Sequence, residues 1–264
     1  MQLPIDHLFA FALVVVFPLR AALSGMRRLR RASPERLPEV RQAVYLEAIA
    51  LQWLLVAILF TMWIVLDRPW YVLGLIPRPT PGFIGTAVGL LIIVVLVWRE
   101  RRAALKSGEM LERLRTQVQH LEVMLPHARP EWHRFIVLSF TAGICEEILF
   151  RGYLLAYLTN WFGLLPAAAL TAVLFGLGHL YQGARGILQT GLFGGFLVAI
   201  YVLTGSLLMP MILHTLMDLH SGHLLFRAYQ READDGAQGL AEARATAEGM
   251  APREAGVPPA SDDA

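Results

Sequence analysis

Apolar runs of about 18 residues or more recur along this chain, and each is long enough to cross a bilayer as a helix. The composition agrees with this reading, because 56% of the 264 residues are hydrophobic and only 17% are charged. The mean hydropathy is +0.51. A soluble domain of this length would carry more charge and shorter apolar runs. The sequence therefore predicts an all-α fold, a polytopic bundle of transmembrane helices.

We expect about seven spans, with the N-terminus outside the cell. Arginine clusters separate the first span from the second and the third from the fourth, which marks these loops as cytoplasmic. The compact, arginine-rich loops favour a multi-pass protein of the inner (plasma) membrane of a bacterial cell. The predicted spans are His7–Leu23, Val44–Leu66, Phe83–Trp98, Trp132–Leu158, Trp161–Leu180, Arg185–Leu203 and Ser206–Phe226.

Four regions follow from this pattern. Residues 1–98 form the N-terminal membrane helices, and residues 132–229 form a second membrane core. Between them, residues 99–131 are basic and have apolar positions at helical spacing, which favours an amphipathic helix along the cytoplasmic interface. A soluble helical hairpin is the alternative for this segment. Residues 230–264 are rich in Ala, Gly, Pro and acidic residues without apolar periodicity, so we expect a disordered cytoplasmic tail.

Charged residues interrupt the fourth span in the stretch TAGICEEILFRGYLL (141–155). A charge near the bilayer centre costs several kcal/mol, so Glu146, Glu147 and Arg151 should face protein or a hydrated cavity. Glu147 and Arg151 are four residues apart on one helical face and can form an ion pair. Glu146 lies about 100° away around the helix and can point elsewhere. Cys145, the only cysteine, is expected to be a small buried packing residue.

Two further spans carry polar residues at the same helical spacing. Phe175 and His179 are four residues apart in the fifth span, as are His214 and Asp218 in the seventh. In a helix bundle these faces can converge on one pocket that contains carboxylates, imidazoles and a charge-balancing arginine.

Such a pocket can hydrolyse a bond in two ways. A glutamate flanked by histidine can act as a general base toward water. Alternatively Glu146, His179 and His214 can hold a zinc ion that activates the water. No HEXXH motif and no serine-nucleophile motif is present in the sequence. A proton or ion pathway uses the same residue types, so residue chemistry alone leaves hydrolase and transporter open.

Three motifs in order along the chain resemble those of a known family. EEILFR (146–151) matches an EExxxR signature, FGLGH (175–179) matches FxxxH, and HTLMD (214–218) matches HxxxN/D. Over about residues 132–226 the chain resembles the CAAX-protease and bacteriocin-processing (CPBP, or Abi) family of intramembrane endopeptidases. The first 131 residues contain no motif of this family.

The resemblance implies a hydrated cavity inside the membrane and peptide-bond hydrolysis without a covalent intermediate. It assigns Glu146 as the general base and His179 as its partner in activating water. It places His214 and Asp218 at the oxyanion, and it gives Glu147 and Arg151 a supporting role. The family has been described both as metalloproteases and as metal-independent glutamate proteases, so the cofactor is either none or zinc, and we favour the glutamate mechanism.

Asp218 departs from the pattern of the prenyl-protein processing branch, which has Asn at this position. Asn can donate a hydrogen bond to an oxyanion, whereas an ionised Asp cannot. Asp218 is therefore expected to be protonated, to orient His214, or to bind a metal.

The predicted partners are the lipid bilayer and a membrane-associated peptide or protein substrate, with no nucleic acid. A proton-coupled transporter is one alternative, although the ionisable residues gather in the second half of the chain instead of following a path. A non-catalytic immunity or scaffold protein on the same fold is the other alternative.

Overall fold

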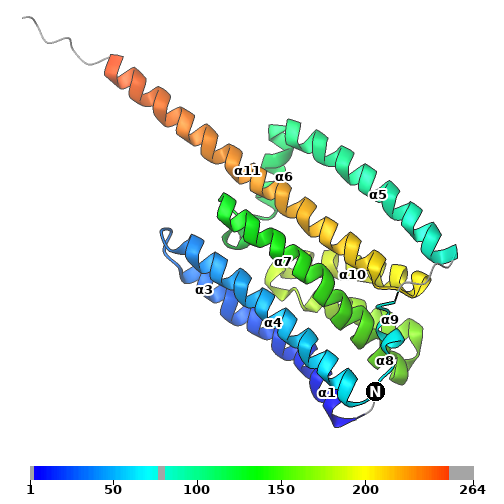
Figure 1. The fold of residues 1–264 in the computed structure, drawn as a ribbon. Helices are drawn as coiled ribbons and strands as arrows, with labels where there is room; N and C mark the ends of the chain where they lie inside the picture. Colours follow the sequence, from blue (N-terminus) through cyan, green and yellow to red (C-terminus); the bar gives the residue numbers. More distant parts are fainter. Residues whose placement is uncertain (1–2, 77–80, 250–264) are drawn as a thin grey trace, which may run out of the picture.

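A computed structural model describes residues 3–76 and 81–249 of the chain. The described part is 89% helical and contains no strand. Figure 1 shows long helices that run up and down between two ends of one bundle, with α11 extending beyond it. The all-α class predicted from the sequence is confirmed.

The N-terminal half begins with one continuous helix, Pro4–Arg31, which we call the N-terminal rod. Helix α4 follows it and runs antiparallel to it. Within the rod, π-helical turns alternate with α-helix. The elements are α1 (Pro4–Phe11), η1 (Ala12–Val16), α2 (Phe17–Arg20), η2 (Ala21–Gly25), α3 (Met26–Arg31), α4 (Leu37–Val65), the 3₁₀ turn η3 (Trp70–Leu73) and α5 (Pro81–Lys106).

The second half contains a long helix, a helical hairpin and the extended last helix. Short α6 and a 3₁₀ turn lead into it from α5. The elements are α6 (Gly108–Gln117), η4 (Gln119–Met124), α7 (Arg129–Glu147), the π-helical η5 (Ile148–Leu154), α8 (Leu155–Phe162), α9 (Leu164–Leu177), η6 (Leu180–Gln182), α10 (Gly183–Thr204) and α11 (Leu208–Gly249). The chain reverses at Gly163 and Gly205, whose φ angles of 75° and 63° suit glycine.

Four helices of the described chain are long and apolar enough to cross a membrane: Pro4–Arg31, Leu37–Val65, Gly82–Lys106 and Leu180–Thr204. By length and composition, these candidate spans indicate a helical membrane protein. The predicted fifth span corresponds to the shorter apolar helix Leu164–Leu177. The predicted fourth and seventh spans fall on the helix from α7 to α8 and on α11, which carry the ionisable residues. The count of seven therefore stays a prediction.

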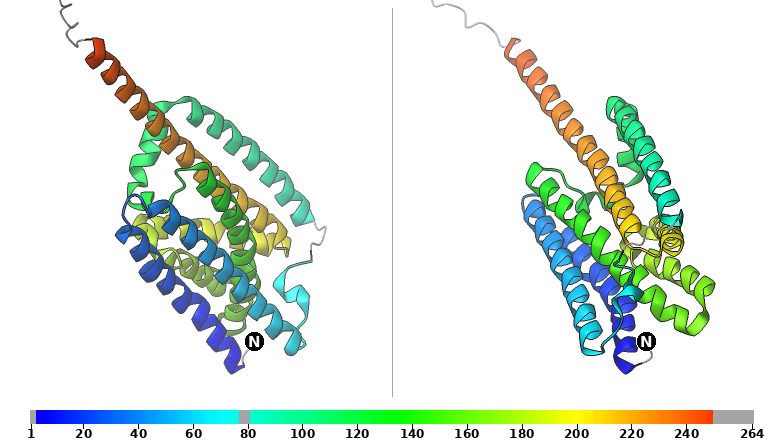
Figure 2. Two further views of the ribbon diagram at one scale, coloured as in Figure 1. Left: turned by 60° about the vertical axis from the view of Figure 1, so that its left-hand side comes forward. Right: turned by 45° about the vertical axis from the view of Figure 1, so that its right-hand side comes forward.

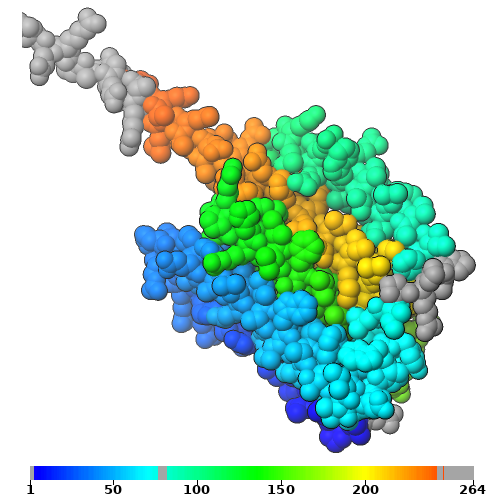
Figure 3. Space-filling model, in the orientation of Figure 1, coloured from blue at the N-terminus to red at the C-terminus, as the bar shows by residue number. Residues whose placement is uncertain are grey.

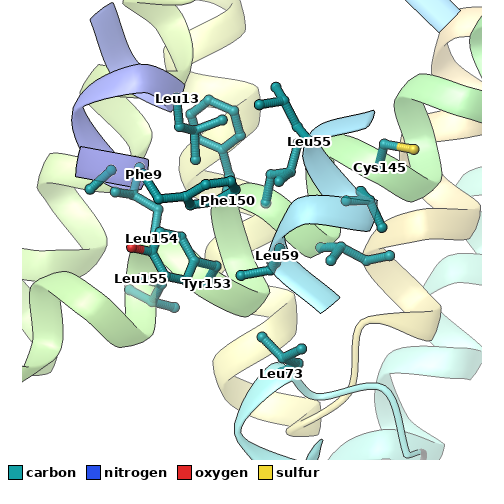
Figure 4. Packing of buried hydrophobic residues seen from close by; sticks show 14 of the residues in the cluster. Phe9, Leu13, Leu55, Leu59, Leu73, Cys145, Phe150, Tyr153, Leu154 and Leu155 are labelled. Carbon is teal, nitrogen blue, oxygen red and sulfur yellow. The ribbon is translucent and has the colours of Figure 1, made fainter. Parts of the chain in front are cut away.

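The main core lies where the N-terminal rod, α4 and η5 meet. Tyr153 is fully buried and donates a hydrogen bond from its hydroxyl to the Asp6 carbonyl oxygen at 2.8 Å. Cys145 is also fully buried in this core, as predicted. Figure 4 shows how side chains from the three elements interlock, among them Phe9, Leu13, Leu55, Leu59, Phe150 and Leu154. This packing fixes the helix that carries the EExxxR motif against the N-terminal half.

A buried ion pair joins α4 to the start of α7. Arg41 and Glu131 lie 2.7 Å apart, with side chains 2% and 1% exposed. The other Glu131 oxygen accepts hydrogen bonds from the backbone N–H groups of His127 and Ala128, which are otherwise unpaired at a helix start. The pair therefore fixes both the beginning of α7 and its position relative to α4.

The segment predicted to lie along the membrane interface packs on another helix. The apolar face of α6, including the buried Leu111, contacts Leu224 and Ala228 of α11. The position of this segment along the membrane interface stays a prediction. Figure 2 shows α6 against α11, and α5 packs against α10 and α11 through the buried Leu90.

The predicted disorder from residue 230 is not what the structure shows. Helix α11 continues to Gly249, and Figure 3 shows it projecting from the bundle. The segment AEARATAE (241–248) consists largely of strong helix formers, so a helix already begun inside the bundle continues through it. Residues 250–264, the rest of the predicted tail, lie outside the described residues.

Candidate active site

The buried pair predicted from the EExxxR motif is present. Arg151 Nη1 lies 2.8 Å from Glu147 Oε1, and both side chains are fully buried. α7 ends at Glu147 and the π-helical η5 carries Arg151, so the winding changes within the motif. π-helical turns of this kind are frequent at functional sites. Neither charge would tolerate burial without its partner.

Arg151 makes two more contacts that fix its guanidinium. Its Nη2 donates to the Gly194 carbonyl oxygen of α10 at 3.0 Å. The guanidinium carbon lies 4.2 Å from the ring centre of Phe175 on α9, a cation–π contact. The first residue of the FxxxH motif thus holds Arg151.

Glu147 also bonds His214, which the sequence did not predict. His214 Nδ1 lies 2.7 Å from Glu147 Oε1, the oxygen that also pairs with Arg151. A carboxylate only accepts, so Nδ1 carries the hydrogen of this bond. The ring is thereby oriented with Nε2 facing away from Glu147.

Glu146 faces the other way, as its position on the helix predicted. Its Oε1 accepts a hydrogen bond from Gln52 Nε2 at 3.3 Å. Its Oε2 is buried without a hydrogen-bond partner and lies 4.0 Å from His214 Nε2. One carboxylate oxygen of Glu146 is therefore held, while the other is available to a ligand.

His179 and Asp218 complete the polar group. His179 follows the end of α9, and its Nδ1 bonds the Phe175 carbonyl oxygen at 2.9 Å. Nδ1 must be the donor in this bond, which leaves a lone pair on Nε2 when the ring is neutral. Asp218 Oδ2 lies 3.8 Å from His214 Nε2, and its side chain is 38% exposed compared with 5% for His214.

These side chains line a cavity of about 320 Å³. Its walls come from both halves of the chain, and apolar residues such as Phe17, Leu51 and Leu138 form much of them. Arg20, Arg28 and Glu47 also line it, so it reaches the arginine-rich end that the sequence marks as cytoplasmic. The predicted residues in its lining are Glu146, His179, His214 and Asp218. Glu147 and Arg151 are not part of the lining and support His214 from behind.

The predicted zinc ligands do not form a metal site in this arrangement. Across residues 3–76 and 81–249, no group of three His, Cys, Asp or Glu side chains is placed to hold a metal ion. Glu146, His179 and His214 line one cavity without converging as ligands. We therefore derive no step through a metal.

Among the cavity residues that sequence reasoning missed are Gln52 of α4 and Tyr181 of η6. The available signal for Gln52 was an uncharged polar residue inside the apolar run IALQWLLVAILF (49–60). Tyr181 gave no comparable signal, because aromatic residues are common at helix ends in membrane proteins.

Fold and site together define a helical membrane protein with an acid–base pocket enclosed by its helices. Residues 128–220 match the family model described as type II CAAX prenyl endopeptidase Rce1-like. The match supports the CAAX-protease (CPBP) family for this segment, which contains all three motifs. No curated protein sequence and no solved structure gives a significant match.

Proposed function

We propose that the chain is an intramembrane endopeptidase in which Glu146 activates a water molecule for attack on a peptide bond. The observation that carries this proposal is the buried Oε2 of Glu146, which has no hydrogen-bond partner although the residue lines the cavity. His179 and His214 line the same cavity, so the groups of an acid–base site are assembled there.

The chemistry follows from these positions. Glu146 takes a proton from water, and the hydroxide oxygen bonds to the scissile carbonyl carbon. His179 orients this water by accepting a hydrogen bond at Nε2. Collapse of the tetrahedral intermediate breaks the C–N bond, and the proton passes from Glu146 to the leaving amine. The products are a carboxylic acid and an amine, between which a proton then passes to give a carboxylate and an ammonium group, and Glu146 is again ionised.

His214 stabilises the oxyanion in this mechanism. Glu147 occupies Nδ1, so a hydrogen on Nε2 points toward the cavity. Asp218 at 3.8 Å favours a hydrogen at that nitrogen, because a nearby carboxylate stabilises the charged ring. Asp218 therefore acts through His214, and it does not need to donate to the oxyanion as an Asn would.

The substrate we propose is a membrane-associated peptide or protein, which reaches the cavity from the arginine-rich side of the bundle. The apolar walls suit an extended segment with apolar side chains. We propose that the protein lies in the inner (plasma) membrane. We also propose seven spans, in which the helix from α7 to α8, α9 and α11 cross the membrane with their polar faces turned to the inside of the bundle.

The test is proteolysis by purified protein in liposomes, using a peptide library fused to a membrane anchor. Wild type is compared with Glu146→Gln and His179→Ala. The control variant is Glu39→Gln, which changes an exposed glutamate on α4. We expect cleavage by wild type and Glu39→Gln, loss in the two site variants, and full activity with a strong chelator. Equal cleavage by wild type and Glu146→Gln would contradict the proposal. Loss on chelation with recovery on adding zinc would replace the glutamate mechanism by a metal mechanism.

A further inference from the structure

Gln52 lies on α4, in the half of the chain that the family match leaves out. It is only 4% exposed and lies within an apolar membrane helix. Burying an amide in such a place is unfavourable unless its polar atoms find partners. A leucine or methionine would fill the same space at lower cost, so the contacts of the amide must account for its presence.

One contact of this amide is with the general base. Gln52 Nε2 donates to Glu146 Oε1 at 3.3 Å, across the boundary between α4 and α7. The opposite orientation of the amide would place two acceptor oxygens against each other, so the nitrogen faces the carboxylate. This bond takes up one oxygen of Glu146 and leaves Oε2 without a partner.

The second polar atom of the Gln52 amide indicates that this residue does more than pack two helices together. Its Oε1 is buried and has no hydrogen-bond partner, although the residue lines the cavity. A glutamine that served only to join two helices would be expected to satisfy both ends of its amide. Here the amide bonds the carboxylate that the mechanism uses, and its other end stays unpaired.

We infer that Gln52 is a positioning residue for Glu146: its amide fixes the carboxylate rotamer and stabilises the ionised form, so that Oε2 is presented to the water. This inference rests on the proposed function. The N-terminal half would then contribute to catalysis through one hydrogen bond, besides forming part of the cavity wall.

The test compares Gln52→Met, which keeps the length of the side chain and removes the donor, with wild type in liposomes. We expect kcat to fall about tenfold, the effect of one hydrogen bond, while KM stays within about twofold. The acid limb of the kcat profile should move to higher pH, because the ionised carboxylate loses a donor. A loss of packing alone would not move this limb. Thr61→Val, the same kind of change at an exposed position of α4, should leave both constants unchanged.

Two controls keep the result decisive. Thermal unfolding of each variant establishes that it is folded, and Gln52→Asn, which keeps the amide but withdraws it by one methylene, tests the same bond if the Met variant is unstable. An inactive Glu146→Gln beside a Gln52→Met with wild-type kcat and pH profile would overturn this inference alone. An active Glu146→Gln would overturn the proposed function itself.

Discussion

Glu147 Oε1 lies 2.7 Å from His214 Nδ1 and so connects α7 to α11 inside the bundle. The same oxygen pairs with Arg151, which in turn bonds the backbone of α10. The Glu147 carboxylate thus links three helices. It holds His214 by Nδ1, which leaves Nε2 facing the cavity. The support of the site and its orientation depend on this one group.

Replacing Glu147 by Gln should destabilise the protein and abolish its activity. The substitution leaves Arg151 buried without a counter-charge, a change that typically costs about 3–5 kcal/mol. The double variant Glu147→Leu, Arg151→Met removes both charges and the acceptor of His214, and it should recover most of that stability. It should remain at least about 100-fold less active, because His214 has lost its orienting acceptor. Thermal unfolding in detergent and proteolysis in liposomes measure the two effects, and an active double variant would contradict this role for Glu147.

Gly143 sets the distance between α7 and α11 next to the site. A Cβ added there would lie 2.9 Å from the backbone nitrogen of Thr215 and would clash with its hydroxyl. Gly143→Ala should therefore push α11 away, displace the neighbouring His214 and destabilise the protein by about 1–3 kcal/mol. Gly89→Ala on α5, where an added Cβ meets nothing within 4 Å, is the matched control. Similar melting temperatures and activities for the two variants would show that this close approach is not needed.

Asp218 should be replaceable by Asn at a smaller loss than by Leu. Both changes remove the charge, but Asn keeps the size and a polar carbonyl near His214 Nε2, whereas Leu keeps no polar atom there. We expect Asp218→Asn to be about tenfold more active than Asp218→Leu, because its amide dipole still acts on the ring across the 3.8 Å contact. The ratio of kcat/KM for the two variants on one cleaved peptide checks this. Equal rates would show that a polar group at this position does not assist His214.

Stability at acidic pH should depend on His127, which precedes α7 and stacks on Tyr229 at 4.1 Å. Burial, with Arg41 nearby, holds the pKa of His127 below its ordinary value of 6.5. The unfolded chain therefore binds a proton at this histidine more readily than the folded chain does. The stability that the neutral, buried His127 contributes is present above pH 6.5 and is lost as the pH falls toward the folded pKa. His127→Phe keeps the stacking and should reduce the fall in melting temperature between neutral and acidic pH. His133→Gln, at an exposed histidine, should leave that fall unchanged, and equal slopes in all three proteins would contradict the role of His127.

Much of the site could be predicted from the sequence because helical spacing is a local property. Residues four apart share a face in any helix, so the pair of Glu147 with Arg151 follows from the sequence alone. The separate direction of Glu146 follows from the same geometry. Charged residues in an apolar span must also face protein, which is why the positions of His179 and His214 at one cavity could be expected.

The contacts between distant segments could not be predicted in this way. The bond from Glu147 to His214 and the bond from Gln52 to Glu146 depend on how α4, α7 and α11 pack, which no local pattern specifies. The same limit explains the segment at 99–131, where periodicity predicted an apolar face but not the helix that covers it. The helical continuation to Gly249 depends on α11 being already formed inside the bundle.

The most direct test of the account is the value of kcat/KM for Glu146→Gln relative to wild type in liposomes. One anchored peptide that wild type cleaves is used, with Glu39→Gln measured beside it. Gln keeps the shape of the side chain and its contact distance to Gln52, but it cannot take a proton from water. The account predicts a loss of at least about 100-fold for Glu146→Gln and no change for Glu39→Gln. A Glu146→Gln protein that is folded and cleaves the peptide at the wild-type rate would contradict it.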